Sequence, residues 1–275
     1  MSAIDIRPLT PTIGAEVLGV DLSRPLSDET IGSLRRALLD HLVIFFRDQE
    51  LDPESQLAFA RRFGSINVAP FGPKHPDYPE LTVLDQDAPR GQGADSWHSD
   101  NTFMLEPPMG SILRVVELPG SGGDTCFASM YAAYEALSEP LKALIGGLNA
   151  VHDLTKTLAQ AIASGLSGAD LAQMQEEWPA REHPVVRTHP ETGRKALFVN
   201  GNFTTRLAGL EPRESGALLP FLIDHVRDPA FQCRFRWAPG SVAFWDNRSV
   251  QHFGVPDYSQ RRLMHRVTLD GDRPF

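Results

Sequence analysis

The chain has few cysteines, no long apolar run and no pattern that would send it out of the cell. Only two of its 275 residues are Cys, so a disulfide framework does not hold the fold together. The apolar run Leu42–Phe46 is far too short to span a bilayer. The first residues lack the basic segment followed by an apolar one that marks a signal peptide. We therefore expect a cytoplasmic protein without a membrane segment.

Positive charge is also in deficit. The 26 Lys and Arg residues face 35 Asp and Glu, which gives a net charge of −9. This balance argues against a nucleic-acid surface, although clustered arginines could still bind a small anion. The 41% hydrophobic and 22% charged fractions are ordinary for a globular protein, and no repeat or low-complexity tract occurs. The length fits one domain over residues 1–275.

The order of predicted elements is mixed. Ser27 is a plausible N-cap for a helix that leads into a buried strand at 43–46, and Asp52-Pro53 begins a second helix that ends at Gly64. Two shorter helical pieces are predicted at 131–137 and 139–145.

The second half of the chain combines an irregular segment with strands. Residues 154–181 have weak periodicity and many small residues, so we expect a partly helical, mobile insertion of the kind that closes over an active site. Apolar and polar residues alternate over 231–237. Pro239-Gly240 and a second apolar stretch at 242–245 follow, which predicts a hairpin.

The most informative residues are His98 and Asp100, which can be paired with the distant His252. Two imidazoles and one carboxylate are the set that holds Fe(II) on one face and leaves the other face open for oxygen and a co-substrate. We therefore predict that these three residues are the metal ligands and the catalytic centre.

The spacing of His98 and Asp100 is weak evidence alone. With nine His and 20 Asp in the chain, about 0.7 such pairs are expected by chance. A second pair, His75 and Asp77, does occur, but it lies in a proline-rich run that predicts a loop. Because catalytic ligands are better held on rigid elements, we favour His98 and Asp100.

Two arginines, Arg262 and Arg266, follow His252 by 10 and 14 positions. Arg262 can bind the far carboxylate of a 2-oxo acid, because its planar guanidinium makes two charge-assisted hydrogen bonds. Arg266 lies four residues later, which on a strand places it on the same face. His265 between them should face the other way and be an ordinary packed or surface residue. The competing interpretation of these arginines is a solvated basic patch.

Several motifs together resemble the taurine/2-oxoglutarate dioxygenase family. They are residues 97–103 (WHSDNTF), 122–125 (GGDT), 244–248 (FWDNR) with 251–252 (QH), and 260–266 (QRRLMHR). The resemblance covers nearly the whole chain. It implies a mainly β protein with flanking helices around a double-stranded β-helix (jelly-roll) core.

The resemblance also implies a dioxygenase that uses Fe(II), 2-oxoglutarate and O₂. His98, Asp100 and His252 match the iron ligands, Thr125 and Arg262 match the holders of the 2-oxoglutarate C5 carboxylate, and Arg266 matches a binder of an anionic substrate. Phe103 and Phe203 are further candidates for substrate contact, although an aromatic residue is more often part of the core. The expected partners are a small anionic organic substrate and further copies of the chain.

The likeness weakens in the substrate pocket. Ala69, Gly72 and Ala94 stand where the taurine-specific enzymes have polar residues, so taurine is doubtful. An alkyl sulfonate, an alkyl sulfate or an aryloxy carboxylate would fit an arginine beside an apolar wall, and the sequence does not choose among them.

Two other functions remain open at this stage. Two His and a carboxylate also suit a catalytic zinc ion, so a jelly-roll zinc hydrolase is possible, as is a protein that binds an anion without turnover. Arg262 favours the oxygenase, because a zinc hydrolase has no need of a carboxylate-binding arginine at that position. Asp246-Asn247-Arg248 resembles a catalytic cluster, but a turn with side-chain to backbone hydrogen bonds is the safer interpretation.

Overall fold

The computed structural model describes residues 4–68, 72–89, 96–163, 165 and 169–275, with only the backbone at position 160. The helices are α1 (Asp28–His41), α2 (Pro53–Arg61), α3 (Met130–Glu135), α4 (Glu139–Ile145), α5 (Thr155–Ala163), α6 (Leu171–Glu177) and α7 (Pro212–Asp224), with two 3-10 helices, η2 (His225–Arg227) and η3 (Pro229–Phe231).

The strands are β1 (Asp5–Pro8), β2 (Ala15–Leu18), β3 (Val43–Phe46), β4 (Ile66–Asn67), β5 (Thr82–Gln86), β6 (Gly110–Glu117), β7 (Thr125–Ser129), β8 (Asn149–His152), β9 (Arg181–Pro184), β10 (Val186–Thr188), β11 (Lys195–Leu197), β12 (Thr204–Leu207), β13 (Gln232–Phe235), β14 (Val242–Asp246), β15 (Val250–Gly254) and β16 (Arg262–Leu269).

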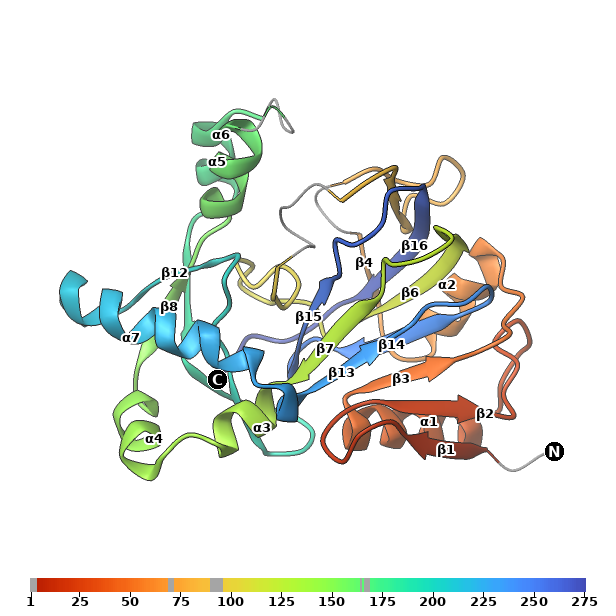
Figure 1. Cartoon of the computed structure of the whole chain (residues 1–275), viewed down its shortest axis with the longest axis horizontal. Helices are drawn as coiled ribbons and strands as arrows, with labels where there is room; N and C mark the ends of the chain where they lie inside the picture. The colour runs from red at the N-terminus through yellow and green to blue at the C-terminus, as the bar shows by residue number, and fades with distance from the viewer. Residues whose placement is uncertain (1–3, 69–71, 90–95, 164, 166–168) are drawn as a thin grey trace.

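Two sheets enclose the main core (Figure 1). The large sheet has the order β1-β2-β3-β14-β6-β16-β4, and β5 also pairs with β16. The smaller sheet has the order β13-β7-β15. The last four strands alternate between the two sheets: β13 and β15 belong to the small sheet, whereas β14 and β16 belong to the large one. This alternation is the arrangement of a jelly roll.

The predicted hairpin at 231–245 is therefore wrong, although both of its strands exist. β13 pairs with β7, whereas β14 pairs with β3 and β6 in the other sheet. The Pro239-Gly240 turn carries the chain across the sandwich instead of folding it back on itself. Both strands bury apolar side chains, and alternation along a strand does not show which neighbour it pairs with.

The run of apolar residues in β3 is explained by burial on both faces. Val43 and Phe45 belong to the core between the sheets, where Phe45 lies 5.5 Å from Phe127 of β7 between ring centroids. Ile44 and Phe46 belong to a second core under α1 and α2. A strand covered on both faces shows a continuous apolar run instead of alternation.

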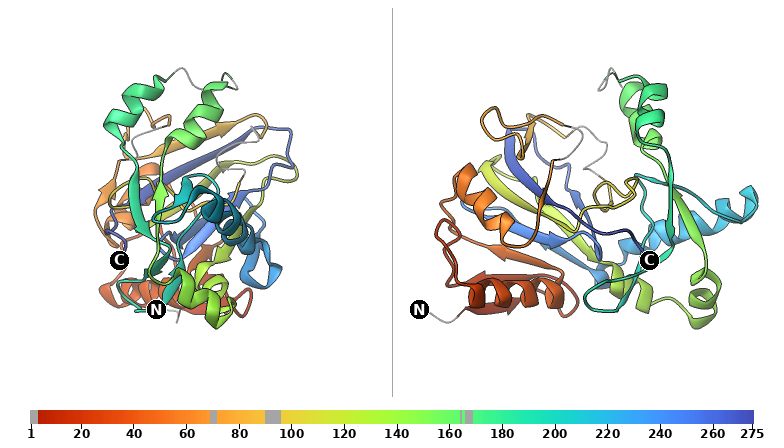
Figure 2. Two further views of the ribbon diagram at one scale, coloured as in Figure 1. Left: turned by 90° about the vertical axis from the view of Figure 1, so that its left-hand side faces the viewer. Right: turned by 180° about the vertical axis from the view of Figure 1, so that it is seen from behind.

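The predicted helices 28–42 and 53–63 are confirmed, with small differences at their ends. Ser27 caps α1 by accepting a hydrogen bond from the Thr30 amide at 3.2 Å, and Asp52 caps α2 from the Ser55 amide at 2.7 Å. These helices cover the outer face of the large sheet, and Figure 2 shows this layer from two further sides.

The segment 154–181 is helical in part, as predicted. It contains α5 and α6, which lie together at one end of the molecule, outside the two sheets (Figures 1 and 2). Its mobility stays a prediction. Within the described residues, no helix combines the length and the apolar character needed to cross a bilayer.

Candidate metal centre and co-substrate site

Backbone pairing brings His98 and His252 together across 154 positions of sequence. The His98 amide donates to the His252 carbonyl at 3.1 Å, and the His252 amide donates to the His98 carbonyl at 2.8 Å. β15 carries His252 and is held in the small sheet by β7. The two imidazole rings lie 4.4 Å apart between centroids. A rigid strand thus fixes one ligand and, through this pair of bonds, the other.

Asp100 completes a compact cluster with the two histidines. Its Oδ1 lies 3.6 Å from Nε2 of His98 and 4.0 Å from Nε2 of His252, and all three residues are buried. Adjacent ligands of a metal bound at about 2.1 Å are roughly 3 Å apart, so an ion needs only a small contraction of this cluster. Among the described residues, this is the group of three whose ligand atoms lie within 4.8 Å of one another.

The hydrogen bond of His98 and the pKa of His252 both suit a metal. Nδ1 of His98 lies 2.8 Å from the Ser96 carbonyl, which can only accept, so Nδ1 is the donor and Nε2 is the ring nitrogen that faces Asp100. Burial, followed by the proximity of His98, lowers the pKa of His252 to about 3. The His252 ring is therefore neutral near pH 7, as coordination requires.

Asp100 is held in its ionised form by its neighbours. Burial alone would raise the pKa of this carboxyl, but the charge of Arg266, followed by the two histidines, lowers it well below its usual range. Nη1 of Arg266 donates to Oδ1 at 2.9 Å, and the Ser111 hydroxyl donates to Oδ2 at 3.2 Å. Arg266, predicted to bind the substrate anion, thus also contacts a candidate metal ligand.

Thr125 and Arg262 contact each other. Nη2 of Arg262 is 3.5 Å from the Thr125 hydroxyl, which also accepts from the indole N–H of Trp237 at 3.0 Å. Nε of Arg262 donates to the Gly123 carbonyl at 3.1 Å, and the side chain is 8% exposed. A hydroxyl on β7 and a buried guanidinium on β16, strands of the two different sheets, form the pair that the sequence predicts for a carboxylate.

The two glycines before Thr125 are required by this contact. Gly122 and Gly123 have φ angles of +78° and +71°, which L side chains rarely adopt. A Cβ at Gly123 would lie 3.1 Å from Cδ of Arg262, and one at Gly122 would collide with the main chain of Asp257. The Gly-Gly-Asp-Thr motif thus lets the backbone approach the arginine.

Arg262 and Arg266 lie four residues apart on β16, and this spacing places both side chains on the same face, as predicted. Arg262 and Arg266 both face the site, and Met264 between them belongs to the core that the two sheets enclose. His265 faces the opposite way, where it is buried and lies 3.0 Å from Nη2 of Arg114. The prediction of an ordinary packed histidine is borne out.

The competing pair, His75 and Asp77, lies elsewhere. The His75 ring contacts those of Tyr78 and His265 at centroid distances of 5.3 and 5.2 Å, and its Nδ1 accepts from the Asp77 amide at 3.2 Å. This is the geometry of a loop with a local hydrogen bond. The structure brings neither residue into the buried cluster.

Phe103, which follows Asp100 by three residues, packs against Phe203. Their rings lie 5.2 Å apart, and Trp178 at the end of α6 meets Phe103 edge-on at 5.7 Å. With Leu154 they form a small apolar core of their own, which ties the insertion to the segment that carries Asp100.

The pocket residues that made taurine doubtful are only partly described. Ala69 and Ala94 lie outside the described residues. Gly72 has a φ of +88°, and a Cβ there would lie 3.4 Å from the Thr82 methyl group, in ordinary contact. The argument against taurine therefore remains a prediction from the sequence.

Asn247 contacts the candidate metal ligand Asp100, and the sequence motif that contains Asn247 did not predict this contact. Residues 246–248 form the predicted turn, yet the Asn247 side chain contacts the backbone of Asp100 on both sides. The turn motif gave no signal of this, because the partner lies almost 150 positions away. Ser111, which donates to the Asp100 carboxylate, was also missed, because no motif marks it.

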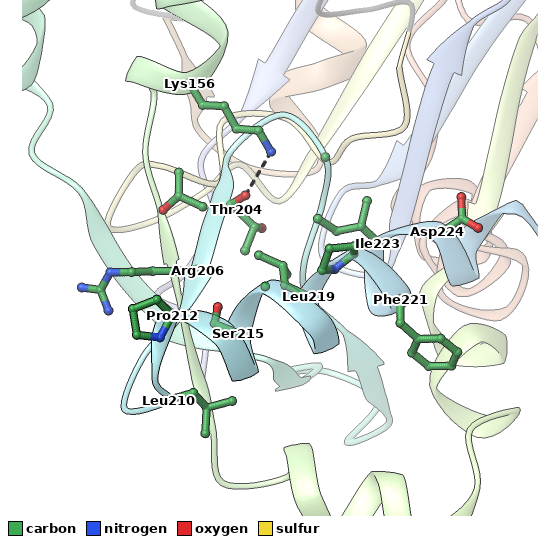
Figure 3. Close-up of a pocket in the computed structure, with 14 residues that line it drawn as sticks. Lys156, Thr204, Arg206, Leu210, Pro212, Ser215, Leu219, Phe221, Ile223 and Asp224 are labelled. Carbon is green, nitrogen blue, oxygen red and sulfur yellow. Dashed lines mark hydrogen bonds between the residues drawn. The ribbon is translucent and has the colours of Figure 1, made fainter.

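A large cavity lies away from this cluster. It has a volume of about 1150 Å³ and is lined by residues of α7, β12 and α5, as Figure 3 shows. Lys156 reaches into it and donates to the Thr204 carbonyl at 3.2 Å. Leu210, Leu219, Phe221 and Ile223 supply apolar lining. None of the predicted site residues lines this cavity.

The fold and the cluster together define an Fe(II)-type centre on a jelly roll, and the comparisons agree. The family model "Taurine catabolism dioxygenase TauD, TfdA family" matches residues 5–268, and the chain belongs to this family. The alternatives of a zinc hydrolase and of an anion-binding protein without turnover are thereby set aside.

Three curated relatives align with nearly the whole chain. An alpha-ketoglutarate-dependent sulfate ester dioxygenase of Pseudomonas putida is 41% identical, over 98% of this chain and 91% of the relative. An alkylsulfatase of Acinetobacter baylyi is 38% identical over 98% and 86%. A (S)-phenoxypropionate/alpha-ketoglutarate-dioxygenase of Sphingobium herbicidovorans is 38% identical over 98% and 96%.

Solved structures confirm the fold. A structure described as a putative alpha-ketoglutarate-dependent taurine dioxygenase from Burkholderia xenovorans matches with a TM-score of 0.86 and 38% identity, over 99% of this chain and 94% of that one. AAD-2 in complex with Mn(II) and N-oxalylglycine matches with a TM-score of 0.85 and 30% identity, over 99% of both chains. The protein is therefore a 2-oxoglutarate-dependent dioxygenase, an oxidoreductase that uses Fe(II), 2-oxoglutarate and O₂.

Proposed function

We propose that the protein hydroxylates a small organic anion with an apolar tail, and that alkyl sulfate esters are its first candidate substrates. The observation that carries the proposal is the buried cluster of His98, Asp100 and His252 beside two arginines on one strand face. We assign iron to the three residues of the cluster. When bound, Fe(II) with 2-oxoglutarate and O₂ supplies the oxidant that inserts one oxygen atom into a substrate C–H bond, while 2-oxoglutarate becomes succinate and CO₂.

Arg262 and Thr125 would hold the far carboxylate of 2-oxoglutarate. The bond from Nε to the Gly123 carbonyl and the contact with Thr125 fix the plane of the guanidinium. Because the side chain is almost fully buried, water screens its charge little, and a carboxylate that replaces water there gains strong charge-assisted bonds. These residues would thus orient the co-substrate towards the metal cluster.

Arg266 would hydrogen-bond both to the metal ligand Asp100 and to the substrate anion. A guanidinium has five N–H donors, and Nη1 alone contacts Asp100. Its Nε is buried and has no hydrogen-bond partner in the part of the chain that the structure describes. An anionic head group would therefore find donors here, a short distance from the carboxylate that holds the metal.

The apolar core around Phe103 would receive the tail of the substrate. Phe103 follows Asp100 by three residues, and Phe203, Leu154 and Trp178 continue this packed apolar cluster towards the insertion. A charged head on Arg266 and a tail on this apolar cluster would place the carbon atoms next to the head group nearest the metal. That arrangement predicts oxidation beside the anionic group.

Relatives that act on sulfate esters make this class the first to test. Hydroxylation of R–CH₂–OSO₃⁻ at the carbon that carries the ester oxygen gives R–CH(OH)–OSO₃⁻. The C–O bond to sulfate then breaks, the hydroxyl proton leaves, and the products are R–CHO and sulfate. The same logic gives sulfite from a sulfonate, and a phenol with a 2-oxo acid from an aryloxy carboxylate.

A substrate panel tests the proposal. The purified enzyme is supplied with Fe(II), 2-oxoglutarate and O₂ and is offered hexyl sulfate, hexanesulfonate, an aryloxypropionate, taurine or hexanol. We expect succinate and free sulfate in equal amounts from hexyl sulfate, and no stimulation by hexanol, which lacks the anion. Equal succinate formation with hexanol and hexyl sulfate would contradict a substrate recognised by its charge.

We further propose a single domain over residues 1–275, a cytoplasmic location and a homo-oligomeric state, without nucleic acid or membrane as partners. Both cysteines are free and buried, which fits a reducing compartment.

The proposed oligomer rests on an exposed aromatic residue. Phe221 is 52% exposed beside the large apolar cavity of α7, and a second copy of the chain would cover this face (Figure 3). Sedimentation velocity of the wild type and of Phe221→Glu tests the oligomer.

A further inference from the structure

Asp100 stands in a segment that no regular strand fixes. Over the described residues 96–109 the pairing is an isolated bridge at His98, and Asn101 turns away with a φ of +51°. A carboxylate ligand must nevertheless be held to within about 0.5 Å for a working metal centre. Something other than a strand ladder therefore has to fix its position.

The Asn247 side chain supplies this contact. Its Oδ1 accepts from the Asp100 amide at 2.7 Å, and its Nδ2 donates to the Asp100 carbonyl at 3.0 Å and to the Pro108 carbonyl at 3.1 Å. The carboxamide thus brackets both polar groups of the Asp100 backbone. Because Asn247 is 1% exposed, water does not compete for these bonds.

The turn that presents Asn247 is itself held by buried charges. Asp246 accepts from the Arg248 backbone amide at 3.0 Å and from Nε of Arg248 at 2.9 Å, and its other oxygen lies 3.0 Å from Nε2 of His189. Arg248 also contacts Glu191 at 2.8 Å. These contacts fix the direction of the Asn247 side chain.

The same turn leads into β15, which carries His252. Three neighbouring contacts join β15 and its turn to the segment that carries His98 and Asp100. The first is the pair of backbone hydrogen bonds between His98 and His252. The others are the hydrogen bond from the Ser99 hydroxyl to the Val250 carbonyl at 2.7 Å and the contact of the Asn247 side chain with Asp100. One connection between β14 and β15 thus determines the relative positions of all three ligands.

We propose that Asn247 is a positioning residue of the metal centre, which sets the place of the Asp100 carboxylate relative to the two imidazoles through the Asp100 backbone. The proposal rests on the assignment of the metal to His98, Asp100 and His252. It gives the Asp-Asn-Arg turn a role in metal affinity that a purely structural turn would not have.

The test compares two buried carboxamides. Gln56 is the matched control, because it is fully buried and its Nε2 donates to the carbonyls of Ile112 and His265, both at 3.1 Å, without contact to a metal ligand. Asn247→Ala, Gln56→Ala and Asp100→Ala are prepared free of metal. Anaerobic titration calorimetry then gives the Fe(II) or Mn(II) affinity of each, well below its melting temperature.

We expect Asn247→Ala to bind metal about 10- to 100-fold more weakly than the wild type, as other residues that orient metal ligands do. Gln56→Ala should stay within about twofold, although its melting temperature also falls. Asn247→Asp keeps the acceptor for the Asp100 amide, but its second oxygen faces the carbonyls of Asp100 and Pro108, so its affinity should fall at least as far as that of Asn247→Ala. Asn247→Ser, which keeps a small polar side chain and also loses the contact with both carbonyls, replaces Asn247→Ala if that protein does not fold.

Two results would overturn the proposal in different ways. If Asn247→Ala and Asn247→Asp bind metal like the wild type while Asp100→Ala does not, the metal assignment stands and Asn247 is merely structural. If Asp100→Ala binds metal like the wild type, the assignment of the metal falls, and the role of Asn247 falls with it.

Discussion

Replacing Arg262 with Ala should weaken 2-oxoglutarate binding by one to two orders of magnitude. The guanidinium is 8% exposed and lies beside the Thr125 hydroxyl, so a carboxylate bound there is shielded from water. Charge-assisted hydrogen bonds of this kind contribute about 1.5–3 kcal/mol, which corresponds to roughly 10- to 150-fold in affinity. Two groups that Arg262 contacts, the Gly123 carbonyl and the Thr125 hydroxyl, are uncharged.

The assay is an anaerobic titration of the Fe(II) enzyme with 2-oxoglutarate, followed by the absorption band of the chelate. Arg262→Lys keeps the charge but cannot make the bidentate hydrogen bonds, so its affinity for 2-oxoglutarate should lie between those of Arg262→Ala and the wild type.

Arg261 is the matched control for this change. It is one residue away, and its exposed side chain pairs with Asp85 and Glu117. Because surface ion pairs contribute about 0–1 kcal/mol, Arg261→Ala should leave the titration nearly unchanged. Equal affinities of Arg262→Ala and Arg261→Ala for 2-oxoglutarate would refute the assignment.

Three further predictions follow from other contacts. Arg266→Ala should leave 2-oxoglutarate affinity nearly unchanged but weaken an anionic substrate by about tenfold or more and uncouple succinate formation from product, which parallel assays of the two products would show. Asp246→Ala should lower the free energy of unfolding by about 3–5 kcal/mol, because it removes the buried one of the two carboxylates that Arg248 contacts, and urea unfolding would measure this. Burial lowers the pKa of His183 and of His265 to about 4 from the ordinary 6.5, so between these values the unfolded chain binds protons that the folded chain does not. Stability should therefore fall as the pH drops from about 6.5 to 4, and a flat pH profile in urea unfolding would contradict this burial.

Much of the site could be predicted because its residues occur in spaced motifs. Arg262 and Arg266 share a face since β16 pairs with β5 in unbroken register there, and period-two alternation gives that result directly. The helix caps at Ser27 and Asp52 could be read from local sequence for a similar reason, as only neighbouring amides are involved.

The rest depends on contacts between distant segments. The pairing of β13 with β7, and not with β14, is decided by the sandwich as a whole, so the turn at Pro239-Gly240 gave a wrong hairpin. The bonds from Asn247 to Asp100 and the contact of Arg266 with the same residue depend on side-chain positions across the fold. No local pattern in the sequence contains that information.

The central claim is that His98, Asp100 and His252 hold the iron that drives 2-oxoglutarate turnover. The most direct measurement is succinate formation by purified His98→Ala, Asp100→Ala and His252→Ala with Fe(II), 2-oxoglutarate and O₂, beside the controls His75→Ala and Asp77→Ala from the other His-x-Asp pair. We predict that each of the first three variants loses substrate-coupled succinate formation, because loss of one of three protein ligands weakens the metal and disturbs its geometry. The two controls should turn over like the wild type, since His75 and Asp77 lie in a separate loop. Succinate formation at the wild-type rate by any of the three ligand variants would contradict the claim.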